Sequence, residues 1–288
     1  MASNRFCITD VFAEGPYAGN QLATVFDAFA ISSEEMQQIA REFNFSETTF
    51  VGGGSSDAGF DVRIFTPTTE LPFAGHPTLG TAFLLRDAAD GAAAVTLNLG
   101  VGKITVTFGD DGVLWMRQVA PDFRDEVAAA DVAAELGIDV AGIRADAPCQ
   151  IVSTGIPFLM VPLVSHAELV AARPGGGSLS EGLLVFAPDG YTADQQLGCR
   201  MFARELGVGE DPATGSANGC LAAYLRQHAL LGDGPVDILV GQGYEIGRPS
   251  QLYLRARLAT DGGLDVGEAF RVEVGGRTRL VAEGMLQR

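Results

Sequence analysis

The amino-acid sequence predicts an α+β fold of two pseudo-symmetric domains, each a mostly antiparallel sheet or barrel wrapped around one central helix. Two segments, residues 77–86 and 217–228, read as strongly apolar helices, and the first shows so little polar surface that we expect it to be buried on every side. Each segment lies between groups of short apolar runs that are typical of strands. The 288 residues suffice for two domains of about 140 residues each.

The first domain is expected to span residues 1–120. Gly15-Pro16 and Gly19-Asn20 are turn pairs that separate its first two strands. The Ser-Ser-Glu-Glu stretch at 32–35 is a capping pattern, and Met36 begins the apolar stripe of a helix that follows it. We expect strands at residues 6–11, 21–26, 48–51, 60–65, 95–99, 103–108 and 113–118, a glycine-serine loop at 52–56 and a turn-dense stretch at 67–77.

The second domain is expected to span residues 130–276, after an acidic, alanine-rich linker at 121–131. The order of the first domain recurs here, and the ten residues 213–222 parallel residues 73–82 at the starts of the two apolar helices. A last strand at about 277–288 is allowed to return to the first domain. We expect a short helix at 131–137, strands at 150–153, 158–163, 183–187, 236–240, 251–257, 264–274 and 277–285, a surface loop at 174–177 and a turn-dense stretch at 210–216.

Composition narrows the function classes. The net charge of -17 argues against nucleic acid and anionic membranes as partners. The first residues carry no apolar signal region and no run of 18 apolar residues exists, so we expect a cytoplasmic protein. The four cysteines lack C-x-x-C spacing and the three histidines are widely spread, so we expect reduced thiols and no metal site.

The starts of the two apolar helices are the first candidate site. A buried helix leaves its first N–H groups unpaired, and these groups favour an anion. Gly75 and Gly215 would let a ligand approach the backbone closely. If a pseudo-twofold axis relates the two halves, both helix starts point into the cleft between the domains, where they would grip a small carboxylic acid.

Each polar residue near these helix starts also has an ordinary structural interpretation. Ser216 is a preferred type for a helix N-cap, His76-Pro77 would suit a helix with proline at its first position, and Asp211-Pro212 is a common turn. The coincidence of a glycine beside a polar residue at both starts favours a site.

Glu47 is the candidate general acid and base. It precedes a predicted strand and is flanked by Phe45 and Phe50. A carboxyl group in apolar surroundings has a raised pKa, and proton transfer near neutral pH needs such a group. The alternative is a surface glutamate that ends a loop between helix and strand.

Several segments, in order along most of the chain, resemble the PhzF-like (phenazine biosynthesis PhzC/PhzF) family. The Phe-Ala-Gly-His-Pro-Thr and Glu-Asp-Pro-Ala-Thr-Gly-Ser-Ala runs are long and specific, and neither is broken. The segments are Asp10-Val11-Phe12 with Gly19-Asn20, Asn44-Phe45-Ser46-Glu47-Thr48-Thr49-Phe50, Arg63-Ile64-Phe65-Thr66-Pro67, Glu70-Leu71-Pro72-Phe73-Ala74-Gly75-His76-Pro77-Thr78, Glu210-Asp211-Pro212-Ala213-Thr214-Gly215-Ser216-Ala217, and Gly241-Gln242-Gly243 through Gly247-Arg248-Pro249-Ser250.

The resemblance implies the fold of diaminopimelate epimerase, often as a homodimer. It also implies that a glutamate moves a proton within trans-2,3-dihydro-3-hydroxyanthranilate without a metal or an organic cofactor. Glu47 matches that glutamate. His76, Asp211 and Ser216 match its relay and substrate-contacting partners, and Ser46 matches a residue near the substrate carboxylate.

Related epimerases and racemases use two cysteines, one at each helix start. In this chain those positions hold His76 and Ser216, and Cys220 lies one turn further along its helix, where we expect it to face the core. We therefore do not expect a mechanism with two thiols.

The function expected from the sequence is a cofactor-independent isomerase that uses a single glutamate on a small carboxylate-bearing metabolite. The alternative is a non-catalytic member of the same fold that binds a small acid or another protein. No pattern in the loops at 52–59 and 174–177 identifies the substrate.

Overall fold

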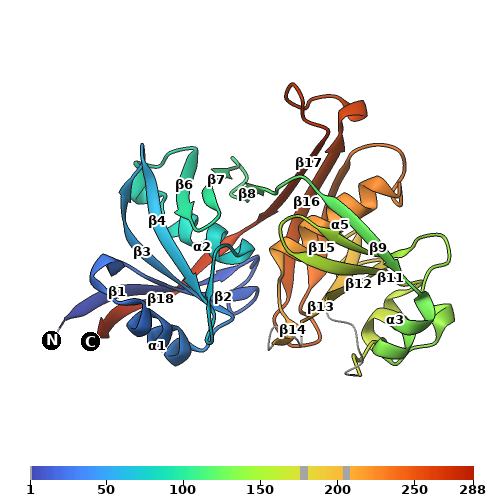
Figure 1. The fold of residues 1–288 in the computed structure, drawn as a ribbon, viewed down its shortest axis with the longest axis horizontal. Coiled ribbons are helices and arrows are strands. Elements are labelled where there is room, and N and C mark those ends of the chain that lie inside the picture. The colour runs from blue at the N-terminus through green and yellow to red at the C-terminus, as the bar shows by residue number, and fades with distance from the viewer. Residues whose placement is uncertain (1, 176–180, 204–207) are drawn as a thin grey trace. The chain divides into compact units, whose positions relative to one another are not determined.

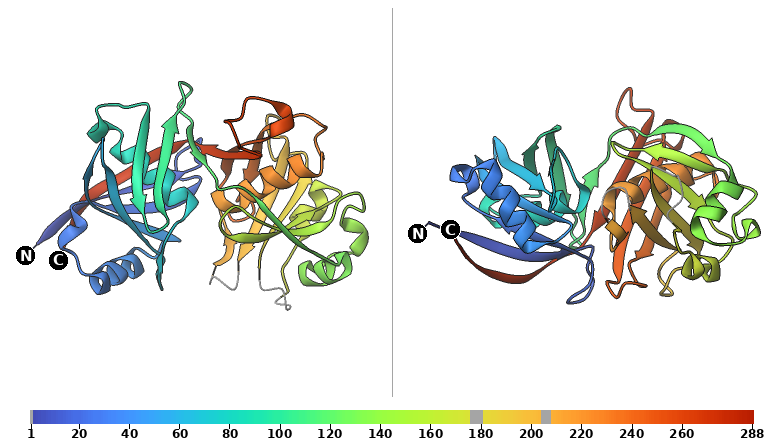
Figure 2. Two further views of the ribbon diagram at one scale, coloured as in Figure 1. Left: turned by 45° about the horizontal axis from the view of Figure 1, so that its top comes forward. Right: turned by 60° about the horizontal axis from the view of Figure 1, so that its bottom comes forward.

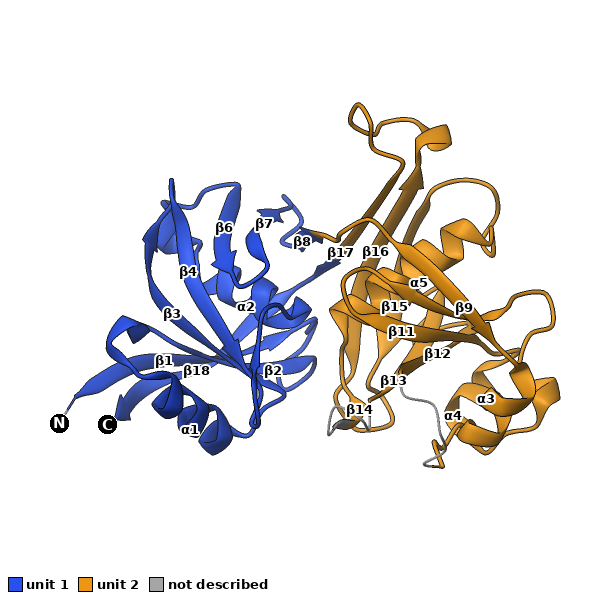
Figure 3. Cartoon of the chain, viewed as in Figure 1, with its two compact units in different colours: residues 1–116, 275–288 blue, residues 117–274 orange. Residues whose placement is uncertain are grey.

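The computed structural model describes residues 2–175, 181–203 and 208–288. The chain forms two compact units, which Figure 3 shows in different colours. Unit 1 contains Met1–Met116 and Gly275–Arg288, and unit 2 contains Arg117–Val274. The last strand of the chain thus lies in the same unit as the first.

Unit 1 is a strand-rich unit whose first and last strands pair with each other, so both chain ends lie together (Figure 1). Its elements are β1 (Ser3–Val11), β2 (Asn20–Val25), α1 (Ser33–Phe43), β3 (Glu47–Ser55), β4 (Gly59–Phe65), β5 (Glu70–Leu71), α2 (Gly75–Leu85), β6 (Ala94–Leu99), β7 (Gly102–Phe108), β8 (Leu114–Arg117) and β18 (Thr278–Gln287).

Unit 2 has the same character. Its elements are β9 (Asp122–Val127), α3 (Ala129–Leu136), β10 (Cys149–Ser153), β11 (Pro157–Pro162), α4 (His166–Ala171), β12 (Gly182–Pro188), β13 (Leu197–Ala203), β14 (Val208–Asp211), α5 (Gly215–Gln227), β15 (Val236–Gln242), β16 (Ser250–Leu258) and β17 (Phe270–Gly276), whose last two residues belong to unit 1.

The strand pairings of unit 1 recur in unit 2 one by one. The antiparallel pairs β1–β2, β3–β4, β4–β5 and β6–β7 correspond to β10–β11, β12–β13, β13–β14 and β15–β16. The parallel pairs β2–β3 and β4–β6 correspond to β11–β12 and β13–β15. The predicted architecture of two similar, mostly antiparallel sheets is confirmed.

Each repeat carries one helix that is buried along almost its whole length. In α2 and α5 nearly every residue is buried, including the polar ones near the start. Helix α1 instead packs on the outside of the sheet of unit 1 through Met36, Ile39 and Ala40, as the two views in Figure 2 show. A sheet that encloses its helix leaves that helix no face for solvent, which explains the apolar sequence of α2.

The two central helices begin two residues earlier than predicted, at Gly75 and Gly215. Pro77 is therefore the third helical residue and not the first. Ala74 and Thr214 hold the N-cap positions, so the structural interpretation of Ser216 as an N-cap is wrong.

Several other expectations were wrong. The stretch at 121–131 forms β9 and the start of α3 instead of a linker, because Phe123 and Val127 are half-buried while the acidic residues face outward. Residues 52–55 continue β3, and residues 264–269 are not strand. Strands β13 and β14 and helix α4 were not predicted, since the buried Arg200 interrupts the apolar pattern of β13. Of the expected loop at 174–177, residues 176 and 177 lie outside the described residues.

Three buried threonines connect β2, β3 and α2 in unit 1. The hydroxyl of Thr49 lies 2.8 Å from the hydroxyl of Thr24 and accepts a hydrogen bond of 2.9 Å from Thr81. All three side chains are fully buried. The network fixes how α2 lies against the strand that begins at Glu47.

We predict that Thr49→Val destabilises the protein, because the substitution keeps the shape but leaves the buried hydroxyls of Thr24 and Thr81 without this partner. The free energy of unfolding, measured by urea denaturation, should fall by about 1–3 kcal/mol. Thr105→Val is the matched control, since Thr105 makes the same kind of hydroxyl pair with Thr96 on an exposed surface. The control should change the free energy by less than about 0.5 kcal/mol, and equal losses in both variants would contradict the assignment.

Candidate functional site

Glu47 and His76 come together in unit 1. Glu47 is the first residue of β3 and lies beside Leu22 of the parallel strand β2, while His76 is the second residue of α2. The Oε2 atom of Glu47 is 3.5 Å from Nε2 of His76. The Glu47 side chain is 17% exposed, so it is neither a surface residue nor sealed in the core.

Burial keeps the imidazole of His76 neutral. The residue is 5% exposed, and the loss of solvent lowers its pKa from 6.5 to about 3, although a hydrogen bond with the backbone of Gln21 opposes this shift. Glu47 and His76 are therefore a carboxyl group facing a neutral ring, not an ion pair.

The hydrogen bonds of the ring indicate its tautomer. Within the described parts of the chain, Nε2 of His76 has no hydrogen-bond partner, so the bond to the Gln21 backbone is made by Nδ1. A bond that raises the pKa of a histidine goes to an acceptor, so Nδ1 carries the proton. The lone pair of Nε2 then faces Glu47 and is available to accept a proton.

The start of α2 offers two backbone amides next to this pair. The first helical hydrogen bond runs from the amide of Thr78 to the carbonyl oxygen of Ala74, at 3.4 Å. The amides of Gly75 and His76 precede it, and Pro77 has none. Ser46 is half-buried and directly precedes Glu47.

The start of α5 in unit 2 offers three amides. Its first helical hydrogen bond joins the amide of Asn218 to the carbonyl oxygen of Thr214 at 3.0 Å, which leaves the amides of residues 215–217 without a partner in the helix. Ser216 is the second helical residue and is 7% exposed. Its carbonyl oxygen accepts a hydrogen bond of 3.4 Å from the Thr154 hydroxyl.

Asp211 ends β14 and is 9% exposed. Its Oδ2 atom accepts a hydrogen bond from the hydroxyl of Thr214, three residues later. Its backbone carbonyl oxygen accepts a second hydrogen bond, of 2.8 Å, from Nε2 of Gln242 at the end of β15. Both the carboxyl group and the backbone of Asp211 are thus fixed by neighbouring side chains.

Three residues of this unit were missed as site candidates: Thr214, Asn218 and Gln242. The Gly241-Gln242-Gly243 motif was noticed only as part of the family resemblance. Its physical reason is a close approach: Gly243 has φ +79°, and a Cβ atom there would lie 2.5 Å from the carbonyl oxygen of Pro212. Only glycine lets the end of β15 lie against the loop that carries Asp211.

The cysteines are unsuited to act as nucleophiles. Cys220 is fully buried in α5, as expected, and its Sγ lies 3.5 Å from the Thr154 hydroxyl. Burial raises its pKa to about 11 and also raises the pKa of Cys149 to about 11. A thiol in either place stays protonated near neutral pH and is a weak nucleophile.

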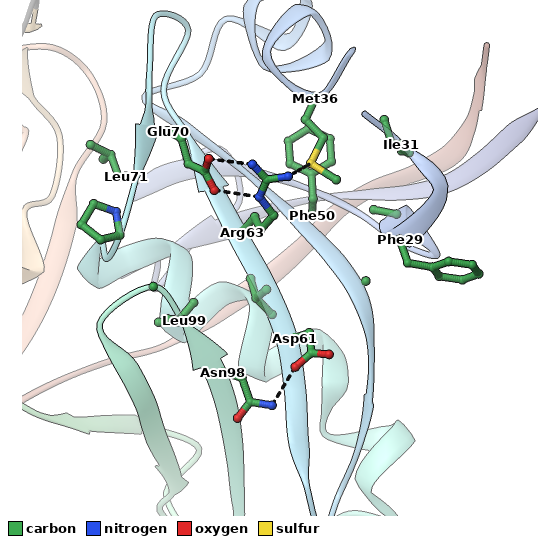
Figure 4. A pocket seen from close by; sticks show the side chains of 15 residues that line it. Phe29, Ile31, Met36, Phe50, Asp61, Arg63, Glu70, Leu71, Asn98 and Leu99 are labelled. Carbon is green, nitrogen blue, oxygen red and sulfur yellow. Dashed lines mark hydrogen bonds and ion pairs between the residues drawn. The ribbon is translucent and has the colours of Figure 1, made fainter. Parts of the chain in front are cut away.

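A separate pocket of about 600 Å³ lies in unit 1 between η1 (Ala28–Ala30), β3, β4 and the turns before α2 and after β6 (Figure 4). Its guanidinium, Arg63, is held by Glu70 at 2.6 and 2.7 Å, and Asp61 adds another acidic group. Neither Glu47 nor His76 lines it. The carboxylates make this pocket a poor place for an anionic ligand.

Two searches of the described residues found nothing. No group of three or more histidine, cysteine, aspartate or glutamate side chains in residues 2–175, 181–203 and 208–288 is arranged to hold a metal ion. Over the same residues, no helix is both long and apolar enough to cross a membrane.

Comparison with known proteins gives concordant matches. The family described as "Phenazine biosynthesis-like protein" matches residues 9–284. A trans-2,3-dihydro-3-hydroxyanthranilate isomerase from Pseudomonas aeruginosa is 36% identical over 98% of both chains. Its namesake from Pseudomonas chlororaphis is 37% identical over 98% of this chain and 99% of that protein.

Solved structures agree. A phenazine biosynthesis protein of the PhzF family from Bacillus anthracis superposes with a TM-score of 0.89 at 25% identity, over the full length of both chains. A hydroxyproline epimerase from Agrobacterium vitis has a TM-score of 0.59 at 11% identity, over 99% of this chain and 92% of that one, which concerns the fold alone. The predicted diaminopimelate epimerase-like fold is confirmed.

We predict that His76 makes the stability depend on pH. Below about pH 6.5 the unfolded chain binds a proton that the folded protein refuses until about pH 3, so the free energy of unfolding falls as the pH falls through this range. This residue should contribute a slope of up to about 1.4 kcal/mol per pH unit. Urea denaturation between pH 7 and pH 4 should show a smaller slope for His76→Asn than for the wild type.

His166→Asn is the control, because His166 is only half-buried. It should keep the wild-type slope. If the pH dependence of His76→Asn is parallel to that of the wild type, the buried neutral imidazole is not supported.

Proposed function

Because the chain belongs to the phenazine biosynthesis-like (PhzC/PhzF) family, we propose that it is a cofactor-independent isomerase in which Glu47 shifts a proton within a small carboxylic acid. The observation that carries the proposal is the carboxyl group of Glu47 at 3.5 Å from the neutral imidazole of His76. The two relatives named for an isomerase activity cover nearly the whole chain, which supports the reaction class.

Glu47 is the proton carrier in this proposal. It removes a proton from an activated carbon of the substrate and returns it to another atom on the same face. A single base suits such a shift, whereas inversion at one carbon normally needs groups on both faces. The proposed pKa of Glu47, raised toward neutrality by its apolar neighbours, would suit both steps.

His76 serves as a proton relay and holder. Its Nε2 lone pair faces Glu47, so the ring is able to accept a proton or a hydrogen bond from a protonated carboxyl group. A separation of 3.5 Å is longer than a good hydrogen bond, and such contacts often tighten when the substrate is bound.

We also propose that both helix starts serve the same substrate. The amides of Gly75 and Gly215 would bind its carboxylate, with hydrogen bonds from Ser46 and Ser216, while Asp211 would hold an amine or hydroxyl group. Backbone amides at helix starts bind anions without a charged side chain. This matters for a chain with a net charge of -17, whose overall field does not attract an acid.

The first compound to test is trans-2,3-dihydro-3-hydroxyanthranilate, because the relatives with 36 and 37% identity are named for it. It offers the carboxylate, amine and hydroxyl groups that these side chains would recognise. A homodimer in the cytoplasm stays a prediction from the family resemblance.

We predict that Glu47→Gln abolishes proton transfer, since the amide keeps the shape of the side chain but cannot carry the proton. Turnover of trans-2,3-dihydro-3-hydroxyanthranilate should fall by about 10²–10⁴-fold. Glu42→Gln makes the same change at an exposed position of α1 and should retain wild-type turnover. Near-wild-type turnover by a folded Glu47→Gln protein would refute the mechanism.

The same compound separates an enzyme from a binder. NMR in deuterated water should show solvent deuterium in the product of the wild-type protein and none with Glu47→Gln. If the wild type binds the compound but neither converts it nor exchanges its protons, a non-catalytic binding role is favoured instead.

A further inference from the structure

We propose that Thr214 and Gln242 are positioning residues that orient the carboxyl group of Asp211 during the reaction. This inference rests on the proposed function, in which Asp211 holds a polar group of the substrate. Neither residue needs to touch the substrate, because both act through Asp211. The argument begins with the amide of Gln242, continues through the hydroxyl of Thr214 and ends at the carboxyl group.

The side-chain amide of Gln242 is fully buried and uses its whole hydrogen-bonding capacity. Its Oε1 accepts from Nδ2 of Asn218 at 2.8 Å and from the amide of Thr214 at 3.3 Å. Its Nε2 donates to the carbonyl oxygen of Asp211 at 2.8 Å and to the Thr214 hydroxyl at 3.2 Å. A flipped amide would face donors with a donor, so this orientation is the one that satisfies every partner.

The hydroxyl of Thr214 transmits this orientation to Asp211. A hydroxyl group has one proton to donate, and since Oγ1 accepts from Gln242, its proton goes to Oδ2 of Asp211. Asn218 fixes the same turn from the helix side, where Nδ2 donates to the carbonyl oxygen of Thr214 at 3.1 Å. The carboxyl group is therefore aligned by a chain of side chains with defined directions.

The internal repeat shows what a helix start of this fold needs without such a chain. In unit 1 Ile64 of β4 pairs with Leu71 of β5, and in unit 2 the equivalent pair is Met201 with Asp211. The counterpart of Asp211 is thus Leu71, an apolar residue. The fold forms this turn without a carboxyl group.

The two positioning residues also have apolar counterparts. The helices α2 and α5 begin at Gly75 and Gly215, so Thr214 corresponds to Ala74. The registers of the parallel pairs β4–β6 and β13–β15 place Leu99 where unit 2 has Gln242. All three polar positions of the chain are therefore special to unit 2.

What the repeats share is a different interaction, which supports the turn in both units. Arg63 binds Glu70 at 2.6 and 2.7 Å, and Arg200 binds Glu210 at 2.8 and 2.9 Å. Each guanidinium also lies over a phenylalanine ring two residues further along its own strand. The ion pair supports the architecture, so the network of Thr214 and Gln242 is left to serve the carboxyl group.

The test compares Thr214→Val, which keeps the shape and removes the hydroxyl, with Thr214→Ser, which keeps the hydroxyl. With trans-2,3-dihydro-3-hydroxyanthranilate as substrate, Thr214→Val should lower kcat by about 10–100-fold and change KM by less than about threefold, as is common when a supporting hydrogen bond is lost. Thr214→Ser should stay within about threefold of the wild-type kcat, because it restores the donor.

Tyr224→Phe is the matched control on the same helix. Its hydroxyl donates a buried hydrogen bond of 2.6 Å to the carbonyl oxygen of Pro148, about 15 Å along the helix axis from Thr214. This variant also loses one buried hydroxyl, yet its kcat should equal that of the wild type. If Thr214→Val and Tyr224→Phe have the same kcat, the positioning role is overturned.

Crystal structures of the variants provide a readout that does not depend on activity. The carboxyl group of Asp211 should be rotated in Thr214→Val and unchanged in Thr214→Ser and Tyr224→Phe. An unchanged carboxyl group in Thr214→Val would overturn the inference. If the wild type does not convert the compound, the proposed function fails, while the orientation of Asp211 still decides the positioning role.

Discussion

The structure depends on one constraint: each unit encloses a helix, and the first backbone amides of an enclosed helix have no water to bind. The chain must bring other groups to these amides or leave them for a ligand. In both units the start of the helix is therefore the place where polar side chains gather in an otherwise apolar interior. His76 lies there in unit 1 and Ser216 in unit 2.

The sequence was most informative where the constraint acts locally. The parallel between residues 73–82 and 213–222 identified the two helix starts, and the structure begins the helices at the paired glycines Gly75 and Gly215. The boundaries were two residues late because proline at the first helical position is the commoner arrangement. In this chain Pro77 occupies the third position, where it also removes an unpaired amide.

Interactions between distant segments escaped prediction. Arg200 looked like an interruption of an apolar run, because its partner Glu210 and the carbonyl oxygens of α4 are brought to it only by the fold. Gln242 is 31 residues from Asp211 along the chain, so no local pattern links them. Glu47 and His76 were grouped through the family resemblance, and their contact of 3.5 Å is a product of tertiary structure.

The repeats keep a common architecture and differ in chemistry. The register of β2–β3 and β11–β12 places Gly182 of unit 2 where unit 1 has Glu47. The positions of Thr24 and Thr49 are likewise occupied by Met160 and Leu184. Unit 1 thus carries the proton-transfer pair on a polar support, and unit 2 carries Asp211 on another. Each unit has changed only the residues around its own helix start.

The neutral state of His76 connects this architecture to the proposed chemistry. A charged imidazolium beside Glu47 would hold the carboxylate in an ion pair and weaken it as a base. Complete burial in the enclosed helix removes that charge, and the bond to the Gln21 backbone directs the remaining lone pair toward the carboxyl group. The constraint that forces α2 into the interior is therefore also what leaves Glu47 free to exchange its proton with a substrate.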